Sequence, residues 1–243
     1  GKPGAVVGEA ASASTQDVAD AVAAAKEAFP AWAALGAKER ARLMAEAIAG
    51  IADDRDEDAA ILSQENGKVR FEAWVDALVF EIRWNLALML ADEVDTGKTL
   101  PVMPGIPVNT EVSYQSLGVV TIIVPFNWPI AILGAALPHA LLAGNTAIVK
   151  PPPTAPLATA KLVQRVAEKL PPGVLNIVTG VRDEITQTLA EHDGVDAIWS
   201  GAGDISEVQV ASTGNMKRVW DADINAADEE LQRAATHVKN IWL

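Results

Sequence analysis

The stretch from 117 to 158 constrains the fold more than any other part of this chain. It opens with a run of β-branched apolar residues at 119–124, long enough for one buried strand. A helical pattern follows over 130–143 and ends at Gly144, as at a helix C-cap. Residues 146–149 then predict a second buried strand, which a run of prolines brings to an end. Strand, helix and strand in this order predict a βαβ unit, the building block of a parallel sheet covered by helices.

Two polar side chains stand where these predicted strands end. Asn127 follows the first strand between two prolines, and Lys150 follows the second directly before a proline-rich loop. Ligands of open α/β sheets bind beyond the carboxyl ends of the strands, so both residues are candidates for a site. Taken singly, each is more typical of a turn asparagine or a solvated lysine. Their equivalent places at two strand ends favour a site.

The segments on either side continue the pattern. Downstream, apolar strands and amphipathic helices alternate, which predicts further βα units of the same sheet. Upstream, helices are predicted as far as a Gly- and Pro-rich extended loop at 97–110, and an alternating edge strand follows at 111–117. The predicted fold is therefore α/β, a Rossmann-like parallel sheet with helices on both faces and an N-terminal helical layer. The other predicted helices are 17–30, 37–52, 54–66, 69–95, 157–170, 184–192 and 204–212, and the other predicted strands are 174–178, 195–199 and 217–220.

Large apolar side chains recur at helical spacing in the predicted helix 69–95. Such a stripe is most simply explained by core packing, so we expect it to point into the protein. Its members are Phe71, Trp74, Leu78, Ile82 and Leu86.

Composition limits the classes of function that this chain can have. Half of the 243 residues are hydrophobic, so an ordered core is expected rather than disorder. The net charge of −13 argues against nucleic acid and anionic membranes as partners. No membrane span or signal peptide is expected, and a cytoplasmic location is the simplest interpretation. The chain has no cysteine, which excludes disulfides, thiolate metal sites and a cysteine nucleophile, and no metal site is predicted.

Two motifs at the strand ends carry a family resemblance. Pro125–Pro129 reads P-F-N-W-P, and Ala143–Pro151 reads A-G-N-T-A-I-V-K-P. Both resemble elements of the aldehyde dehydrogenase superfamily, and the similarity extends over residues 1–201. Residues 65–68, E-N-G-K, are similar to a turn of the same family. The resemblance implies the NAD(P)-binding domain of enzymes that oxidise aldehydes to carboxylates.

The resemblance also implies which residues bind NAD or NADP. Lys150 would hydrogen-bond the adenosine ribose, Gly180 would mark the turn where the adenine lies, and Ser200-Gly201 would approach the phosphates. Where the family often has an acid that binds the ribose hydroxyls, this chain has Pro153, which leaves the choice between NAD and NADP open. The expected cofactor-binding residues are Pro125, Phe126, Trp128, Lys150, Pro151, Pro153, Gly180, Ser200 and Gly201.

The phosphate-facing turn departs from the family pattern at two positions. Ala202 lacks the hydroxyl that the family places there, and Ser206 replaces a glycine. The usual G-x-G-x-x-G fingerprint is also missing after the first strand. These departures weaken the expectation of tight dinucleotide binding.

One catalytic group of the family has a counterpart in this chain. In the family a cysteine thiolate attacks the aldehyde, an asparagine amide and a backbone N–H hold the oxyanion, and a glutamate activates water. Asn127 matches the oxyanion asparagine, but there is no cysteine, and Ala222 stands at the position of the glutamate. Asp221 and Asp223 are alternative bases, although a solvated acidic segment explains them more simply. We therefore expect the chain to be inactive alone.

The last residues resemble the family's terminal strand. Residues 236–243 read T-H-V-K-N-I-W-L, and with 111–117 they would form a small oligomerisation sheet. The family inserts its catalytic domain before this strand, whereas here residues 224–235 bridge the same junction. The resemblance thus implies a homo-oligomer, or a catalytic dehydrogenase domain as partner, through these two strands. The expected divisions are an N-terminal helical layer (1–110), an oligomerisation strand (111–117), an NAD(P)-binding domain (118–223) and a linker with the C-terminal strand (224–243).

Three interpretations of function stay open. The first is the NAD(P)-binding portion of an aldehyde dehydrogenase-family protein whose nucleophile lies on further residues or on another chain. The second is a pseudoenzyme or assembly module with little or no cofactor binding, similar to the inactive second dehydrogenase-like module of some family members. The third is a cysteine-independent Rossmann enzyme that uses His139 or His192, although the sequence places no acid partner beside either.

Overall fold

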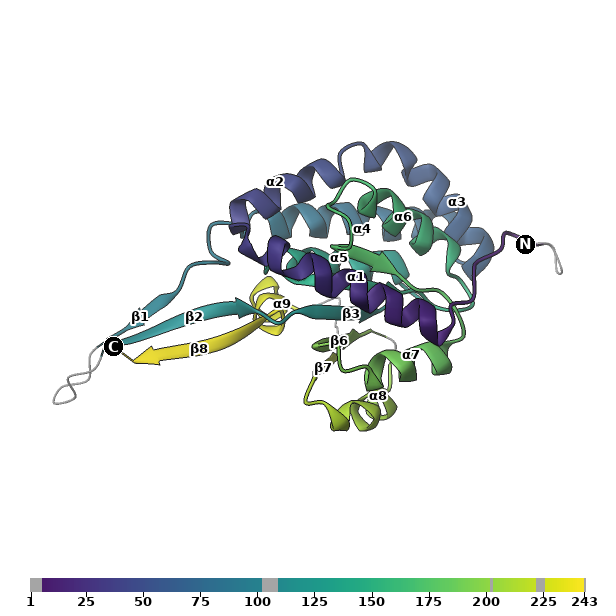
Figure 1. Ribbon diagram of the computed structural model, residues 1–243. Helices are drawn as coiled ribbons and strands as arrows, with labels where there is room; N and C mark the ends of the chain where they lie inside the picture. Colours follow the sequence, from purple (N-terminus) through teal and green to yellow (C-terminus); the bar gives the residue numbers. More distant parts are fainter. Residues whose placement is uncertain (1–5, 102–108, 202, 222–225, 243) are drawn as a thin grey trace.

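A five-stranded parallel sheet forms the centre of the protein (Figure 1). The computed structural model describes residues 6–101, 109–201, 203–221 and 226–242. The strand order is β5-β4-β3-β6-β7, so the chain winds outward from β3 in both directions, and the predicted Rossmann-like α/β fold is confirmed. The strands are β3 (Val119–Ile123), β4 (Thr146–Lys150), β5 (Leu175–Ile177), β6 (Ala197–Ser200) and β7 (Arg218–Asp221).

β3 lies in the middle of the sheet because both of its faces are apolar. All of its residues are buried, and it pairs in parallel with β4 on one side and β6 on the other. Val120 and Ile122 belong to the core on one face of the sheet, and Val119 and Ile123 to the core on the opposite face. A strand buried on both faces requires such a continuous run of β-branched residues. The carboxyl ends of neighbouring strands meet here, with Ile123 beside Lys150.

Helices cover both faces of this sheet. The described residues include no helix long and apolar enough to cross a membrane. One face carries α1 (Thr15–Ala34), α7 (Arg182–Glu191) and α8 (Ser206–Ala211), and the other carries α5 (Pro129–Leu142) and α6 (Leu157–Ala167). An outer layer packs over α5 and α6, and it consists of α2 (Ala37–Ala47), the 3-10 turn η1 (Ile51–Asp54), α3 (Arg55–Asn66) and α4 (Arg70–Leu88).

α4 turns Phe71, Ile82 and Leu86 of its predicted core stripe toward solvent, so that prediction is wrong for these three residues. Trp74 and Leu78 are half-buried, and Trp74 packs against the core. Phe71 is 71% exposed and Ile82 47%, whereas Phe80 is 1% exposed and Trp84 is fully buried. The reason lies in α5, where a Cβ added to Gly134 would stand 2.4 Å from the Cα of Phe80. This close backbone contact selects the face of α4 that packs inward, and apolar periodicity alone does not reveal it.

Helix ends also differ from the sequence prediction. α1 continues through Pro30 instead of ending there, which costs one backbone hydrogen bond. Its last turn is anchored by Trp32, whose indole N–H donates to the carbonyl oxygen of Leu141 at 3.0 Å. The predicted helices 37–52, 69–95 and 157–170 also end early, at Ala47, Leu88 and Ala167.

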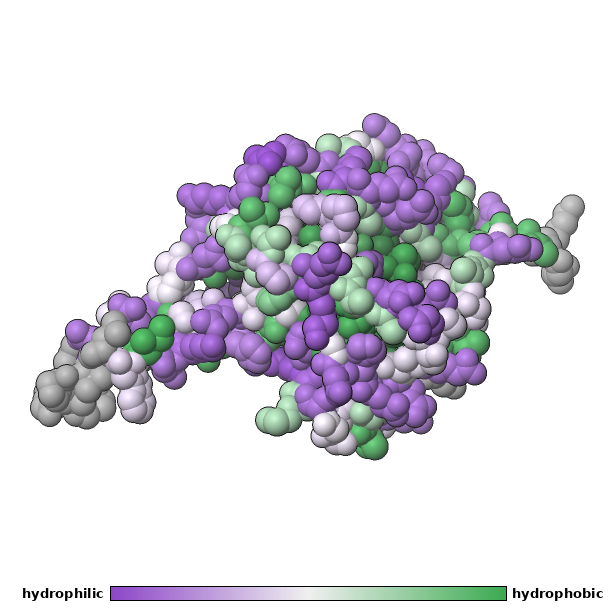
Figure 2. Space-filling model, viewed as in Figure 1, coloured by the Kyte–Doolittle hydropathy of each residue, from purple (hydrophilic) through white to green (hydrophobic). Residues whose placement is uncertain are grey.

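A three-stranded antiparallel sheet, which we call the flap, projects from the body (Figure 1). The predicted pairing of residues 111–117 with 236–243 is confirmed by β2 and β8, and Leu243 lies outside the described residues. β1 is an addition, because the segment 97–110 was predicted to be a loop, of which 102–108 lie outside the described residues. Figure 2 shows hydrophobic and hydrophilic side chains side by side on the flap. The flap strands are β1 (Lys98–Leu100), β2 (Thr110–Ser116) and β8 (Thr236–Trp242), in the order β1-β2-β8.

One buried asparagine fixes the root of the flap. The amide oxygen of Asn145 accepts a hydrogen bond from the backbone N–H of Leu117, where β2 leads into β3. The amide nitrogen donates to the carbonyl oxygens of Ala140 and Ala235. Asn145 thus joins the flap to α5 and to α9 (Asp228–Ala234), a helix within the segment that was predicted to be a linker.

Candidate cofactor site

A cavity of about 600 Å³ opens at the carboxyl ends of β3 and β4 and beside the end of β6. Its walls come from the loops at 124–127 and 152–154 and from Gly201 and Gly203 after β6. Among the described lining residues, Lys150 carries a charge and none is acidic. The site residues predicted from the sequence that meet around this cavity are Pro125, Phe126, Asn127, Lys150, Pro153 and Gly201.

Lys150 is 1% exposed although it lines the cavity. It is the last residue of β4, and its ammonium donates to the carbonyl oxygen of Pro151 at 3.1 Å. Burying a cation costs free energy unless polar groups compensate the lost hydration. At 1% exposure, Lys150 does not have the solvated role that the sequence also allowed.

The loop after β3 presents an amide and an aromatic ring at the cavity wall. Asn127 and Phe126 are both exposed, Phe126 to 45%. Prolines restrict the loop on either side, since Pro125 cannot extend the ladder of β3 and Pro129 occupies the first position of α5. The two side chains therefore stand on stiff backbone.

Other predicted cofactor residues lie outside the lining of this cavity. Trp128 packs instead over Lys68, whose Nζ is 3.8 Å from the ring centroid. Gly180 lies beside the N-terminal segment that precedes α1, with a φ of +149° that a residue with a side chain rarely adopts. Ser200 and Pro151 are buried at the ends of their strands. Their assignment to the cofactor stays a prediction.

The turn between α3 and α4 contacts the two loops that follow β3 and β4. The Glu65 carboxylate accepts hydrogen bonds from the backbone N–H groups of Leu157 and Ala158, at 2.7 and 2.9 Å. The Asn66 amide donates to the carbonyl oxygen of Phe126. The sequence did not predict these contacts. The one sequence feature that pointed to this turn was the similarity of residues 65–68 to a family turn.

A buried ion pair lies next to the same turn. Lys68 Nζ is 2.8 Å from Asp76 Oδ2, and the two side chains are 7% and 0% exposed. The other oxygen of Asp76 accepts the backbone N–H of Ala131 at 2.6 Å, in the first turn of α5. Burial raises the pKa of Asp76, and the hydrogen bond from Lys68 opposes that shift.

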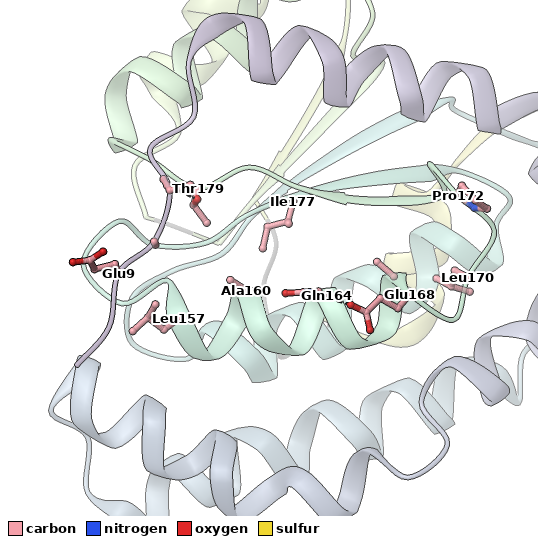
Figure 3. Close-up of a pocket in the computed structure, with 12 residues that line it drawn as sticks. Glu9, Leu157, Ala160, Gln164, Glu168, Leu170, Pro172, Ile177 and Thr179 are labelled. Atoms are coloured by element: carbon pink, nitrogen blue, oxygen red, sulfur yellow. Dashed lines mark hydrogen bonds between the residues drawn. The ribbon is translucent and has the colours of Figure 1, made fainter. Parts of the chain in front are cut away.

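Two further grooves differ from the Lys150 cavity in charge. A groove of about 540 Å³ runs along α6 and β5 beside the N-terminal segment, and Glu9 and Glu168 line it (Figure 3). A groove of about 610 Å³ between α7 and α8 includes Glu191 and Glu207. Neither has a lysine or arginine among its described lining residues. Carboxylates repel phosphate groups, so a pyrophosphate is better accommodated beside Lys150.

The segment 203–206 lies between the cavity and the α7–α8 groove, since Gly203 lines the cavity and Asp204 the groove. Asp204 Oδ1 accepts the backbone N–H of Ser206 at 2.9 Å, and its hydrogen bonds with Ser206 lower the pKa of Asp204. The start of α8, a helix of six residues, therefore already faces a carboxylate. Ala202 lies outside the described residues.

His139 has an acid neighbour that the sequence did not place. Its Nε2 is 3.6 Å from Asp228 Oδ1, which is also 3.3 Å from Arg83. His139 is only 1% exposed, and burial lowers its pKa. His192 is engaged locally, because its Nδ1 accepts the backbone N–H of Gly194 at 2.9 Å. Neither histidine lines the Lys150 cavity, so the geometry gives no support to an enzyme that uses one of them there.

Comparison with known proteins decides the family. The model described as "Aldehyde dehydrogenase family" matches residues 2–220, which is most of the sequence. The chain belongs to the aldehyde dehydrogenase family.

Relatives of this aldehyde dehydrogenase-family chain are about twice as long. It is 35% identical over 223 residues to malonate-semialdehyde dehydrogenase 3 of Bacillus cereus, covering 89% of the chain and 44% of that protein. It is 31% identical over 192 residues to D-glyceraldehyde dehydrogenase (NADP(+)) of Picrophilus torridus, covering 77% and 38%. The chain thus spans less than half the length of the curated relatives it matches.

Solved structures agree in fold. An aldehyde dehydrogenase from Brucella melitensis biovar abortus 2308 superposes with a TM-score of 0.82 at 30% identity, over 89% of this chain and 45% of that one. PnpE, solved in complex with nicotinamide adenine dinucleotide, gives a TM-score of 0.80 at 34% identity, over 89% and 45%. The residues matched by the family model, 2–220, include all described residues that line the Lys150 cavity.

Cysteine does not occur among the 243 residues of this aldehyde dehydrogenase-family chain. Asp221, at the end of β7, is exposed, whereas Ala222 and Asp223 lie outside the described residues. Within the described ranges, no group of acidic or histidine side chains could hold a metal ion.

Proposed function

We propose that this chain is the NAD(P)-binding portion of an aldehyde dehydrogenase-family protein. One observation carries the proposal: the cavity at the ends of the parallel strands is lined by a buried lysine and by no acidic residue among those described. A dinucleotide carries negative phosphate groups and ribose hydroxyls, and both are favourable partners for an ammonium group.

The surrounding residues fit the rest of a dinucleotide. Pro125 and Phe126 offer an apolar wall on which a flat ring can pack, and Lys150 would hold a ribose hydroxyl or a phosphate. Pro153 carries no charge that would repel an additional 2′-phosphate, so we expect NAD and NADP to bind with similar affinity. NAD(P) supplies a hydride acceptor when bound. The chain's own contribution is to bind and orient it.

Aldehyde oxidation would need groups that this chain does not have. Asn127 can donate its amide N–H to an oxyanion, but without a cysteine there is no thiolate to form one in the family's manner. We propose that these 243 residues alone do not oxidise aldehydes and that the nucleophile comes from further residues of the same protein or from another chain.

Calorimetric titration of the purified chain with NAD and with NADP tests the binding claim. We expect saturable heat with either cofactor and, in a parallel assay, no aldehyde-dependent formation of NAD(P)H. An absence of heat at about millimolar cofactor would refute the proposed NAD(P) binding, because it corresponds to a binding free energy weaker than about −4 kcal/mol. Turnover of an aldehyde by the cysteine-free chain would contradict the inactivity claim instead.

The flap favours a second candidate function, that of an assembly module. β8 is an edge strand of the flap, and it exposes Val238 to 53%, Ile241 to 42% and Trp242 to 77%. Exposed apolar edge strands tend to pair with another chain. We propose that β8 docks on a second copy or on a catalytic dehydrogenase domain. Light scattering of the wild type and of Trp242→Ser tests self-association: a dimer or larger that dissociates in the variant supports it, and a monomeric wild type excludes it.

A further inference from the structure

We propose that the turn at 65–68, together with Asp76 of α4, positions the two loops that border the Lys150 cavity. The inference rests on the proposed cofactor function, since it assigns the outer helical layer a role in that same site. None of these side chains lines the cavity. They are positioning residues, acting through the backbone of the loops.

The loop after β4 is held through the start of α6. Pro156, the N-cap residue of α6, makes no capping hydrogen bond with its side chain, so the first N–H groups of the helix need another acceptor. Glu65 supplies it from α3, by accepting from both Leu157 and Ala158. Burial raises the pKa of Glu65, and these two hydrogen bonds oppose the shift. The loop 151–156 is thus fixed at β4 by strand pairing and at α6 by Glu65.

The loop after β3 is held by three contacts. Asn66 donates to the carbonyl oxygen of Phe126, next to the oxyanion candidate Asn127. Lys68 lies against the ring of Trp128, a cation–π contact. The helix α5 that follows has no capping hydrogen bond from its own N-cap side chain. The Asp76 carboxylate of α4 instead accepts the backbone N–H of Ala131 in the first turn of α5.

The two sets of contacts meet in one short turn. Glu65 and Lys68 are separated by two residues, yet one reaches the loop after β4 and the other the loop after β3. A buried ion pair such as Lys68–Asp76 is seldom the most stable way to fill its space, because both ions lose hydration. Its location beside the loop that carries Asn127 is what a positioning role requires.

The experiment uses the full chain with matched substitutions. Lys68→Met removes the charge and keeps the stem, and Lys68→Arg restores a cation. Asn66→Ala removes the hydrogen bond from this half-buried side chain to Phe126 and leaves the buried ion pair intact. Lys161→Met is the control, because Lys161 also makes an ion pair between α6 and α3, with Glu57, but lies outside the cavity. The readouts are the Kd for NAD(P) and hydrogen exchange of the backbone N–H groups in the segment 126–131, where Pro129 has none.

We expect Lys68→Met to weaken cofactor binding by about tenfold to a hundredfold, the range seen when groups that orient a site are removed. Lys68→Arg should bind within about threefold of the wild type, because a cation is again available to Trp128 and Asp76. Asn66→Ala should shift Kd in the same direction as Lys68→Met, and the control should not. Unchanged Kd values in both Asn66→Ala and Lys68→Met would overturn the proposal.

Hydrogen exchange separates failure of this inference from failure of the cofactor function. If the wild type binds no NAD(P), the proposed function fails, and the exchange data still decide the positioning role. Faster exchange at 126–131 in Lys68→Met than in Lys161→Met supports that role. Equal exchange in the two variants contradicts it.

Discussion

The two phenylalanines of α4 provide a direct test of how the outer helical layer packs on α5. Phe80 is 1% exposed and faces α5, whereas Phe71 is 71% exposed. Phe80 also contacts Trp84, with ring centroids 5.4 Å apart. The sequence pattern favours the face of Phe71 as the core face, and the structure favours that of Phe80.

Substitution of each phenylalanine by alanine distinguishes the two faces. Phe80→Ala removes a buried ring and leaves a cavity, which typically costs about 3–5 kcal/mol of unfolding free energy. Phe71→Ala removes an exposed ring, and we expect a change within about 0.5 kcal/mol. For a chain of this length, the loss at Phe80 corresponds to a Tm lower by about 6–20 °C.

Urea unfolding followed by circular dichroism measures both variants against the wild type. The structure predicts a lower midpoint for Phe80→Ala at an unchanged slope, and no resolvable shift for Phe71→Ala. Equal losses, or a larger loss for Phe71→Ala, would refute the packing of α4. They would also remove the basis for placing Asp76 against the start of α5, because Asp76 shares the buried face of α4 with Phe80.

Three further predictions concern a close helix contact, a buried histidine and a surface charge. Gly134→Ala should lower the free energy of unfolding by about 1–3 kcal/mol, because the added Cβ would meet the backbone of α4. At Gly214 an added Cβ would meet nothing within 4 Å, so Gly214→Ala should be tolerated, and thermal unfolding compares the two variants. Burial holds the pKa of His139 below its ordinary 6.5 in the folded state, so the unfolded chain binds more protons as the pH falls through 6.5. The free energy of unfolding should therefore decrease by at most about 1.4 kcal/mol between pH 7.5 and 5.5. His139→Gln should abolish this decrease. Asp204→Asn should tighten NAD(P) binding by about twofold to fivefold at low salt, because it removes a negative charge from the turn beside the cavity. Glu168→Gln, in the groove along α6, should leave the affinity unchanged, and titration at two salt concentrations tests both variants.

The sheet and its site edge were predictable from local sequence patterns. Residues 119–124 contain enough β-branched residues to require burial on both faces, which makes β3 central. Pro125 after β3 and Pro151 after β4 mark where the two ladders stop, and therefore where Asn127 and Lys150 stand. Cavity residues contributed by these strand ends could be named because a parallel sheet brings its carboxyl ends to one edge.

Contacts between distant segments were not predictable in this way. The inward face of α4 depends on the absence of a side chain at Gly134, some fifty residues later in the sequence. Asp76 caps α5 across an interface, and no pattern within either helix announces it. α9 was missed because its apolar contact is made mainly by Leu231, too little for a periodic signal over seven residues.

Lys150 is the residue on which the proposed function depends most. Calorimetric titration of Lys150→Met and of Lys161→Met with NAD and NADP measures its contribution directly. We expect Lys150→Met to weaken binding by about tenfold to a hundredfold, since hydrogen bonds from a charged donor contribute about 1.5–3 kcal/mol, and we expect the control to bind as the wild type does. Wild-type affinity in Lys150→Met would contradict the assignment of this cavity to the dinucleotide.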